Sequence, residues 1–287
     1  MKKILGIGNA LTDILVKAPD YSILEKYGFE PGSMNLIEDK LVSPLSEATA
    51  NLKKQYLPGG CAANTIRGLA RMGNSTGFIG KIGKDSYGDI FKKGLKKLDV
   101  TPHLSVSEMK SGCAFTIIPP DKERTFATYL GAAFSLSPDD ISRETIKEYD
   151  LAHIEGYLVQ NHELVKRIMN ICNDTGTTVS LDLASFNIVQ ENLGFLRDIT
   201  ENYVDIIFAN EDEATAYADS DISGSVDHLS EACDLCVVKL GSEGSIVASG
   251  GKKHVIPPIN AEKVDSTGAG DLYAAGFLHE WLNGSSA

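Results

Sequence analysis

The 287-residue sequence lacks the features that would direct a chain to a membrane or to nucleic acid. No apolar run reaches the roughly 18 residues that a transmembrane helix needs. Lys and Arg total 27 against 39 Asp and Glu, giving a net charge of −12, and no basic run with interleaved aromatic residues occurs. Nucleic acid and anionic membranes are therefore poor candidate partners. The first apolar run is broken by Gly6, Gly8 and Asn9, which predicts a strand rather than a signal peptide.

Cysteine is also scarce: five residues, an odd number, scattered along the chain. Cys233 and Cys236 form a CxxC, which a zinc or redox site would use. However, LCVVKL reads as a buried strand, where cysteine packs as a small apolar residue. Because no second CxxC or CxxH accompanies the pair, we favour the buried strand. We expect a reduced, cytoplasmic protein.

Two nucleotide-binding motifs are missing or incomplete. The GxxxxGK[ST] motif of P-loop NTPases does not occur. GIGNAL supplies the first two glycines of a dinucleotide-binding GxGxxG at Gly6 and Gly8, but Leu11 replaces the third. The sequence thus disfavours both of these nucleotide sites.

Short apolar runs alternate with helical patterns along most of the chain. The expected strands are KILGIG, STGFIGKIG, CAFTIIP, LAHI, TVSLDL, DIIFAN, LCVVKLG and SIVAS. The expected helices are 62–72, 86–98, 162–174, 190–202 and 268–282. This alternation predicts one α/β domain, with a mostly parallel sheet covered by helices on both faces.

Two regions, 11–55 and 103–131, break this rhythm. The second reads as two short strands around a turn at Pro119–Lys122. We expect a single domain over 1–287 that carries a small β lid, built from segments at about 11–40 and 103–131.

The stretch VDSTGAGDLYAAGF places small residues directly before an acid and a helix. The first N–H groups of a helix have no partners within it, so the amides of Gly268, Ala269 and Gly270 would form an anion site. Asp271 beside that site is suited to act as a general base on a nucleophilic hydroxyl. An acid that only stabilises the helix N-terminus is the alternative for this stretch alone.

Three further stretches point to a ligand site. PGGCAANT offers the backbone of Gly59 and Gly60 and the side chain of Asn64. FANEDEA places Asn210 and Glu213 three residues apart after an expected buried strand, which suits a hydrated Mg²⁺. A capped helix start is the alternative for that pair, and it is favoured when the stretch is taken alone. VKLGSEGS ends another strand in a glycine-rich turn suited to a nucleotide.

In this order, these stretches resemble the PfkB or ribokinase-like family of carbohydrate and nucleoside kinases over nearly the whole chain. DSTGAGDLYAAGFL resembles the C-terminal signature of the family, and GGCAANTIRGLARMGNSTGFIGKIG its N-terminal signature, with Ile66 where a small residue is usual. NEDE resembles the family's NxxE motif. The resemblance implies a ribokinase-like fold and phosphoryl transfer from ATP to an alcohol, with Mg²⁺ and a candidate K⁺ as cofactors.

The resemblance also implies roles for matching residues. Asp271 would be the base, and the amides of 268–270 the anion hole. The acceptor would be bound by Asn9, Asp13, Gly59, Gly60 and Asn64, and the nucleotide by Asn210, Lys239, Gly241, Ser242, Gly244 and Thr267. Asn210 and Glu213 would hold Mg²⁺ through water. Asp265 resembles part of a monovalent-cation site, with Ser266 where Thr is commoner.

Within the family, the lid segments look most like those of adenosine kinase-like members. YSILEKYGFEPGSMNLIEDK resembles the long N-terminal lid insertion, and KERTFATYLGAA an arginine-bearing lid segment. Arg124 would then reach toward the transferred phosphate, a solvated hairpin arginine being the alternative. Tyr157 would stack on a base or belong to the core. Asn35 and Glu155 depart from the expected pattern and leave room for a sugar or another nucleoside.

The sequence therefore predicts an ATP-dependent kinase for adenosine, another purine nucleoside or a sugar. A free-sugar kinase of ribokinase or fructokinase type and a non-catalytic nucleotide or sugar sensor are the alternatives. The hydroxymethylpyrimidine and pyridoxal kinases share the fold but commonly lack the lid. The resemblance implies further helices after Trp281 that wall the adenine pocket, and these are absent from the sequence. We expect a monomer or a lid-mediated homodimer.

Overall fold

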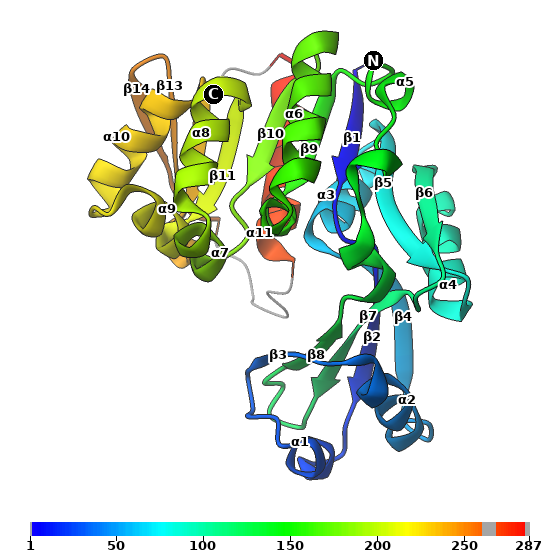
Figure 1. Cartoon of the computed structure of the whole chain (residues 1–287). Coiled ribbons are helices and arrows are strands. Elements are labelled where there is room, and N and C mark those ends of the chain that lie inside the picture. Colours follow the sequence, from blue (N-terminus) through cyan, green and yellow to red (C-terminus); the bar gives the residue numbers. More distant parts are fainter. Residues whose placement is uncertain (1, 260–267, 285–287) are drawn as a thin grey trace.

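The computed structural model describes residues 2–259 and 268–284, which form a large and a small sheet (Figure 1). The nine-stranded sheet has the order β14-β13-β12-β11-β10-β9-β1-β5-β6. Its pairs are parallel except at β13 and β14, which run antiparallel to their neighbours. Its strands are β1 (Lys3–Ile7), β5 (Ser75–Gly83), β6 (Thr101–Ser107), β9 (Leu151–Glu155), β10 (Thr178–Asp182), β11 (Ile206–Asn210), β12 (Leu235–Lys239), β13 (Ser245–Ser249) and β14 (Lys252–Ile256).

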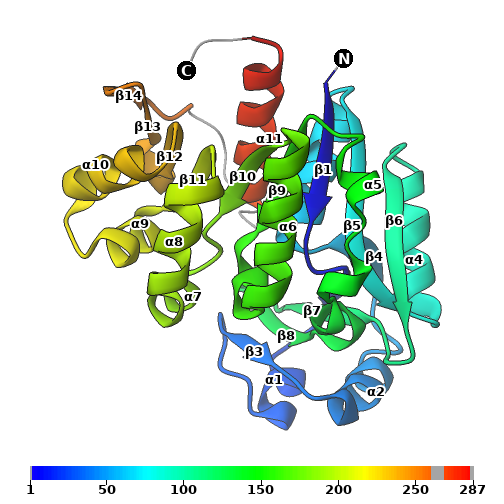
Figure 2. The same ribbon diagram turned by 45° about the horizontal axis from the view of Figure 1, so that its top comes forward.

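Helices cover both faces of this sheet, as the alternating sequence predicts (Figure 2). One face carries α3 (Cys61–Arg71), α4 (Ser86–Lys96) and α11 (Ala269–Leu282). The other carries α5 (Arg143–Ile146), α6 (His162–Thr175), α7 (Phe186–Glu191), α8 (Leu193–Tyr203), α9 (Glu211–Ala218) and α10 (Ile222–Ala232).

Strand β11 shows why apolar runs rather than alternating patterns mark these strands. Successive side chains of a strand point to opposite faces, so both sets must be apolar when both faces are covered. Ile207 and Ala209 pack into the core under α6–α10, whereas Ile206 and Phe208 pack into the core under α3 and α11. Phe208 meets Phe277 of α11 edge to face, with ring centroids 5.6 Å apart.

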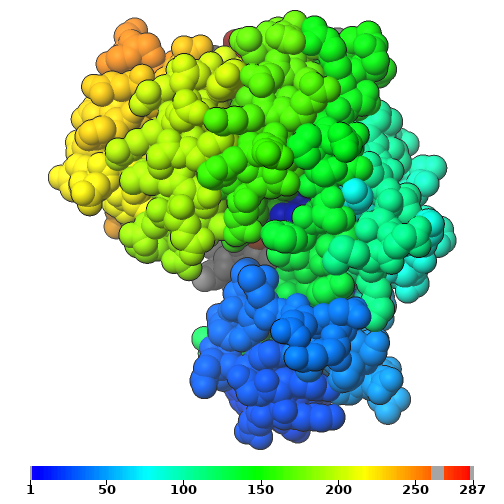
Figure 3. Space-filling model, viewed as in Figure 1, coloured from blue at the N-terminus to red at the C-terminus, as the bar shows by residue number. Residues whose placement is uncertain are grey.

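The small sheet is the lid, and it projects from one end of the main body (Figure 3). Its order is β3-β8-β7-β2-β4, and its own apolar core includes Ile14, Leu24, Leu45 and Phe115. The strands are β2 (Leu11–Lys17), β3 (Met34–Leu36), β4 (Lys54–Gly59), β7 (Gly112–Ile118) and β8 (Thr125–Tyr129). Helices α1 (Ser22–Tyr27) and α2 (Asp39–Ala48) contribute to this core.

The structure differs from the sequence expectation at three boundaries. The lid continues past residue 40 through α2 and β4. Residues 103–107, expected in the lid, belong to β6 at the edge of the large sheet, where the strand is only partly buried and lacks the continuous apolar run of the central strands. The expected helix 190–202 is two helices, because Asn192 adopts φ −121° and ψ 17° between α7 and α8. None of the helices in the described ranges is long and apolar enough to cross a bilayer.

Candidate active site

The first turn of α11 begins at a glycine. Gly268 occupies the N-cap in the left-handed region at φ 71°, where a side chain would be strained, and among the described residues no side chain caps the helix. Ala269 and Gly270 follow as the first helical residues and Asp271 as the third. The N–H groups of this turn can therefore bind an anion that approaches the helix along its axis.

Helix α3 holds Asp271 in place. The Asn64 side-chain Nδ2 donates to Asp271 Oδ2 at 3.0 Å, and the Thr65 hydroxyl donates to the Asp271 carbonyl at 3.2 Å. The two helices pack closely, since a Cβ on Gly68 would lie 2.8 Å from the Ala275 side chain. The N-terminal and C-terminal signature stretches thus meet at one carboxylate.

The carboxyl ends of the parallel strands supply the charged groups around Asp271. The register pairs Asp182 at the end of β10 with Glu155 at the end of β9, and Asn210 of β11 with Lys239 of β12. Lys239 Nζ forms an ion pair with Asp182 at 3.0 Å, and both side chains are largely buried. A Cβ on Gly270 would lie 3.3 Å from Nζ, so the ammonium lies against the first turn of α11. An anion bound at this turn would contact both the backbone amides of α11 and the Lys239 ammonium.

Burial raises the pKa of Asp271 to about 6. The hydrogen bond from Asn64 opposes this rise, the Asp182 charge adds to it, and Lys239 lowers the pKa again. A carboxyl with a pKa near 6 is ionised at neutral pH yet basic enough to accept a proton from a reacting hydroxyl.

A second carboxylate, Asp13 of β2, lies where the lid joins the body. A Cβ on Gly59 would lie 2.2 Å from the Asp13 carboxyl, so only glycine permits this approach. Asp13 keeps partial solvent exposure, but burial still raises its pKa to about 7; Arg67 lowers this pKa and Asp271 raises it. Asp13 and Asp271 therefore influence each other's charge across the site.

Asn9 and Gly60 border a buried carboxyl. Glu155 accepts hydrogen bonds from the Asn9 side chain at 2.7 Å, from the Asn9 amide at 3.3 Å and from the Ala62 amide at 3.2 Å. Burial raises the Glu155 pKa to about 7. The Glu155 carboxyl therefore holds two backbone segments together, one at Asn9 and one at Ala62, next to the Gly59–Gly60 pair that leads into α3.

Asn210 and Glu213 form a capping box at the start of α9. Asn210 Oδ1 accepts from the Glu213 amide at 2.8 Å, and the Asn210 backbone amide and side-chain amide each donate to Glu213 at 2.8 Å. The alternative interpretation of this stretch, a capped helix start, is therefore present in the structure. Glu213 is 3% exposed, and burial together with Asp182 raises its pKa to about 7.

Three other parts of the sequence were predicted to contribute to the site. Gly241, Ser242 and Gly244 form the turn between β12 and β13, directly after Lys239. Tyr157 follows β9 in a 3₁₀ turn and packs partly on the main core, beside Cys61 and Glu155. The predicted residues Asp265 and Thr267 lie outside the described residues.

Arg124 is not brought to Asp271 in this conformation. Strand β2 leaves the body where Leu11 pairs with Gly112 of β7, so the β7–β8 turn lies at the far end of the lid. Arg124 ends that turn, directly before β8. A role at the phosphate would require the lid to close over the body.

The structure adds four site residues that the sequence interpretation did not assign: Cys61, Arg67, Glu155 and Asp182. Asp182 and Glu155 end β10 and β9, and in the sequence they lie at or next to the carboxyl ends of the expected strands TVSLDL and LAHI, so the rule that singles out Asn210 and Lys239 could also have found them. Arg67 lies on the same expected helix as Asn64 and Cys61 directly before it, and nothing in their spacing distinguishes them from surface or core positions.

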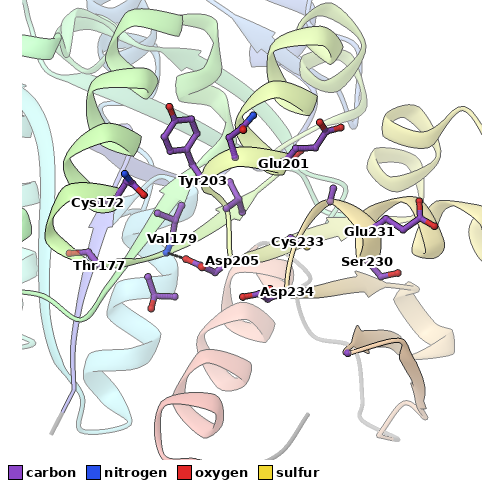
Figure 4. Close-up of a pocket in the computed structure, with 18 of the residues that line it drawn as sticks. Cys172, Thr177, Val179, Glu201, Tyr203, Asp205, Ser230, Glu231, Cys233 and Asp234 are labelled. Atoms are coloured by element: carbon purple, nitrogen blue, oxygen red, sulfur yellow. Dashed lines mark hydrogen bonds between the residues drawn. The ribbon is translucent and has the colours of Figure 1, made fainter.

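A cavity of about 660 Å³ lies elsewhere, at the amino ends of β10, β11 and β12 (Figure 4). Asp205 and Asp234 line it, and Asp205 accepts a hydrogen bond from the Val179 amide at 2.6 Å. The same strands carry Asp182, Asn210 and Lys239 at their other ends. The cavity is therefore separated from the charged cluster by the length of the strands.

Comparisons with known proteins place the chain among carbohydrate and nucleoside kinases in sequence and fold. The sequence profile of the pfkB family carbohydrate kinases matches residues 34–287. Adenosine kinase 2 of Arabidopsis thaliana is 25% identical over 310 aligned positions, covering 99% of this chain and 88% of that protein. An ATP-dependent ribose-1-phosphate kinase of Halopiger xanaduensis is 27% identical, covering 85% of this chain and 79% of that protein.

A solved structure is similar over the same extent. The crystal structure of adenosine kinase from Sinorhizobium meliloti superposes with a TM-score of 0.87 at 30% identity, covering 99% of this chain and 89% of that one. The two sheets described above are thus those of a ribokinase-like α/β fold, as the sequence predicts.

Proposed function

The chain belongs to the PfkB family of carbohydrate kinases, and from that premise we propose that its acceptor is adenosine or another purine nucleoside, phosphorylated at the 5′-hydroxyl. It is an ATP-dependent phosphotransferase that acts on a hydroxyl of a nucleoside or sugar. The observation that carries the assignment of its active site is Asp271, held by Asn64 in the first turn of a helix whose N-cap is glycine, beside Lys239.

In the proposed reaction, Asp271 takes the proton of the acceptor hydroxyl as that oxygen attacks the γ-phosphorus of ATP. The bond to the bridging oxygen breaks and ADP leaves. The amides of 268–270 and the Lys239 ammonium stabilise the charge on the transferred phosphoryl group. Burial favours this arrangement, because electrostatic interactions are stronger where water is excluded.

The acceptor would be bound on the lid side of Asp271. Asp13 can accept hydrogen bonds from two vicinal ribose hydroxyls at once, because a carboxylate offers several lone pairs. Asn9, Gly59, Gly60 and Asn64 line the same junction of lid and body. Tyr157 would contact a base rather than the ribose.

ATP would lie along the turns at the carboxyl ends of β11 and β12, where Asn210, Lys239, Gly241, Ser242 and Gly244 are found. The charged groups near Asp271 include Asp13, Glu155, Asp182 and Glu213 against the cations Lys239 and Arg67. Because these carboxylates would repel the phosphates of ATP, the site suits ATP only when a metal cation accompanies it.

Mg²⁺ fits these residues in an outer shell. Within the described ranges no group of three or more His, Cys, Asp or Glu could hold a metal directly. Mg²⁺ commonly keeps several waters and binds through substrate phosphates, and the Glu213 oxygens retain lone pairs beyond their capping bonds. When bound, Mg²⁺ would neutralise the phosphate charge. We also propose Asp265 for a K⁺ site and Thr267 for the nucleotide.

The lid would close over the acceptor, bringing Arg124 toward the phosphate and excluding water. Met34 and Leu36 of β3 are 64% and 72% exposed, so they offer apolar surface to a base. The same edge is where a lid-mediated homodimer would form, and light scattering distinguishes that dimer from a monomer.

The Asp13 pKa of about 7 predicts a pH-dependent affinity for the acceptor. Above pH 7 the carboxylate accepts from two hydroxyls, and below it the protonated acid loses acceptor capacity. We expect the acceptor KM to rise about 10-fold between pH 8 and pH 6, because about nine tenths of the groups are protonated one unit below the pKa. Steady-state kinetics at fixed ATP measure this. Asp13→Asn should give a high KM that varies little with pH, and a wild-type KM that stays flat would contradict the role.

The acceptor class is tested by ADP release with a panel of nucleosides and sugars. Each aromatic or apolar wall against a base contributes roughly 0.5–1.5 kcal/mol. Two such walls would favour adenosine over free ribose by about one to two powers of ten in kcat/KM. Equal or better kcat/KM for ribose, fructose or a hexose phosphate would overturn the nucleoside assignment and favour a free-sugar kinase.

A further inference from the structure

Arg67 makes two contacts that link the lid junction to the catalytic helix. It lies one turn after Asn64 on α3 and is partly buried. Its Nη1 donates to the Pro58 carbonyl at 2.5 Å and to Asn64 Oδ1 at 3.1 Å. Pro58 belongs to β4, the lid strand that runs directly into α3. One guanidinium nitrogen therefore holds both the base of the lid and the side chain that contacts Asp271.

The contact with Arg67 decides which way the Asn64 amide points. An asparagine amide has an acceptor oxygen on one side and a donor NH₂ on the other, whereas a guanidinium can only donate. Arg67 can therefore be satisfied only by Oδ1. The NH₂ group must then face Asp271, where it lies 3.0 Å from Oδ2.

The direction of this amide has a chemical consequence. A donor facing Asp271 favours the ionised carboxylate, which is the form that accepts a proton. The flipped amide would present Oδ1 instead, and would accept a hydrogen bond from the protonated acid. We propose that Arg67 is a positioning residue for the phosphoryl transfer, which holds the Asn64 amide in the one orientation that keeps Asp271 a base. This inference rests on the proposed role of Asp271.

Stability alone does not explain an arginine at this position. In the described part of the chain, Arg67 Nε is buried without a hydrogen-bond partner, which is unfavourable. Burial and the neighbouring Arg71 also lower the pKa of Arg67, while Asp13 raises it. A neutral side chain of similar length would avoid these costs, so the presence of a cationic donor at this position points to a role in the site.

The test is the pH dependence of kcat at saturating acceptor and ATP. Charged and titratable groups face Asp271 from several elements: Asp13 of β2, Cys61 of α3, Glu155 of β9, Asp182 of β10 and Lys239 of β12. Arg67→Met leaves all of these side chains in place, frees the Asn64 amide and the Pro58 carbonyl, and removes a charge that lowers the Asp13 pKa. We expect the acid limb of the kcat profile to move up by about one pH unit, with kcat recovering at alkaline pH.

Arg71→Met is the matched control, because Arg71 is an exposed arginine one turn further along the same helix. It removes the same charge from α3 without touching Asn64, and its profile should coincide with that of the unmodified chain. The titration of ATP is common to all variants, so it cancels in the comparison. Arg67→Lys should restore the profile, since an ammonium also only donates.

A double variant separates positioning from a general effect. If Arg67 acts through Asn64, adding Arg67→Met to Asn64→Ala should leave the kcat profile of Asn64→Ala unchanged. An unshifted Arg67→Met profile, or additive shifts in the double variant, would overturn the inference. Should Arg67→Met not fold, Arg67→Gln serves the same purpose, because it too frees the amide. Full turnover by Asp271→Asn would instead overturn the proposed function, so the two failures are distinguishable.

Discussion

Replacing Asp271 by asparagine is expected to lower kcat at least about 10²-fold, the usual scale for the loss of a general base. Asparagine keeps the size of the side chain and can still accept the hydrogen bond from Asn64, so the junction of α3 and α11 should remain. What it loses is the basic oxygen whose pKa of about 6 suits proton transfer at neutral pH. The acceptor KM should change far less than kcat, because Asp271 acts on the reacting hydroxyl. Steady-state ADP release with adenosine measures both.

The control for this prediction is Glu163→Gln. Glu163 is an exposed acid in the first turn of α6, so its replacement also removes a charge that favours a helix N-terminus. It should leave kcat unchanged and affect stability slightly. Near-normal turnover by the Asp271 variant would remove Asp271 from the chemistry and return it to the alternative of a stabilising acid.

The Asp271 stretch could be found from sequence because its signals are local. A glycine in the left-handed region at the N-cap and an acid in the first helical turn depend on a few consecutive residues. The buried strands are local in the same sense, since strands covered on both faces must be apolar throughout. Hence β1, β5 and β9–β13 were expected with nearly correct bounds.

The remaining parts depend on register and packing. Asp182 is a site residue because Lys239, 57 positions later, reaches it across β11. Arg67 matters because of what the Asn64 amide faces on another helix. The edge strand β6 was placed in the lid because it is only partly buried and lacks the continuous apolar run that marks the central strands. These relations depend on the tertiary structure, so they cannot be inferred from residue spacing along a single helix or strand.

Removing the divalent metal should abolish transfer altogether. The charges around Asp271 are mostly carboxylates, and without a metal they would repel the phosphates of ATP. A bound metal ion typically contributes several kcal/mol to such a transition state, so we expect a loss of at least about 10³-fold in excess EDTA. Activity should return when Mg²⁺ is added beyond the chelator. Turnover that persists in EDTA would exclude the proposed metal requirement.

The Glu213→Gln variant tests whether Glu213 orients the waters around Mg²⁺ in addition to capping α9. Glutamine at this position preserves a capping box, so the start of α9 should remain folded. It removes the negative charge that would orient waters around Mg²⁺. Because outer-shell substitutions typically cost 10-fold or more in metal affinity, we expect the Mg²⁺ concentration for half-maximal rate to rise about 10-fold, with little change in the acceptor KM.

Glu211→Gln is the matched control for Glu213, since Glu211 is an exposed acid in the same first turn and lies outside the capping box. Its Mg²⁺ requirement should equal that of the unmodified chain, because an exposed charge is screened by solvent. If Glu213→Gln instead raised the acceptor KM and left the Mg²⁺ requirement unchanged, the Asn210–Glu213 pair would be a helix cap alone. The metal would then be held by the phosphates and by other residues, and Asp182, which adds to the rise in the Glu213 pKa, would be the next carboxylate to replace.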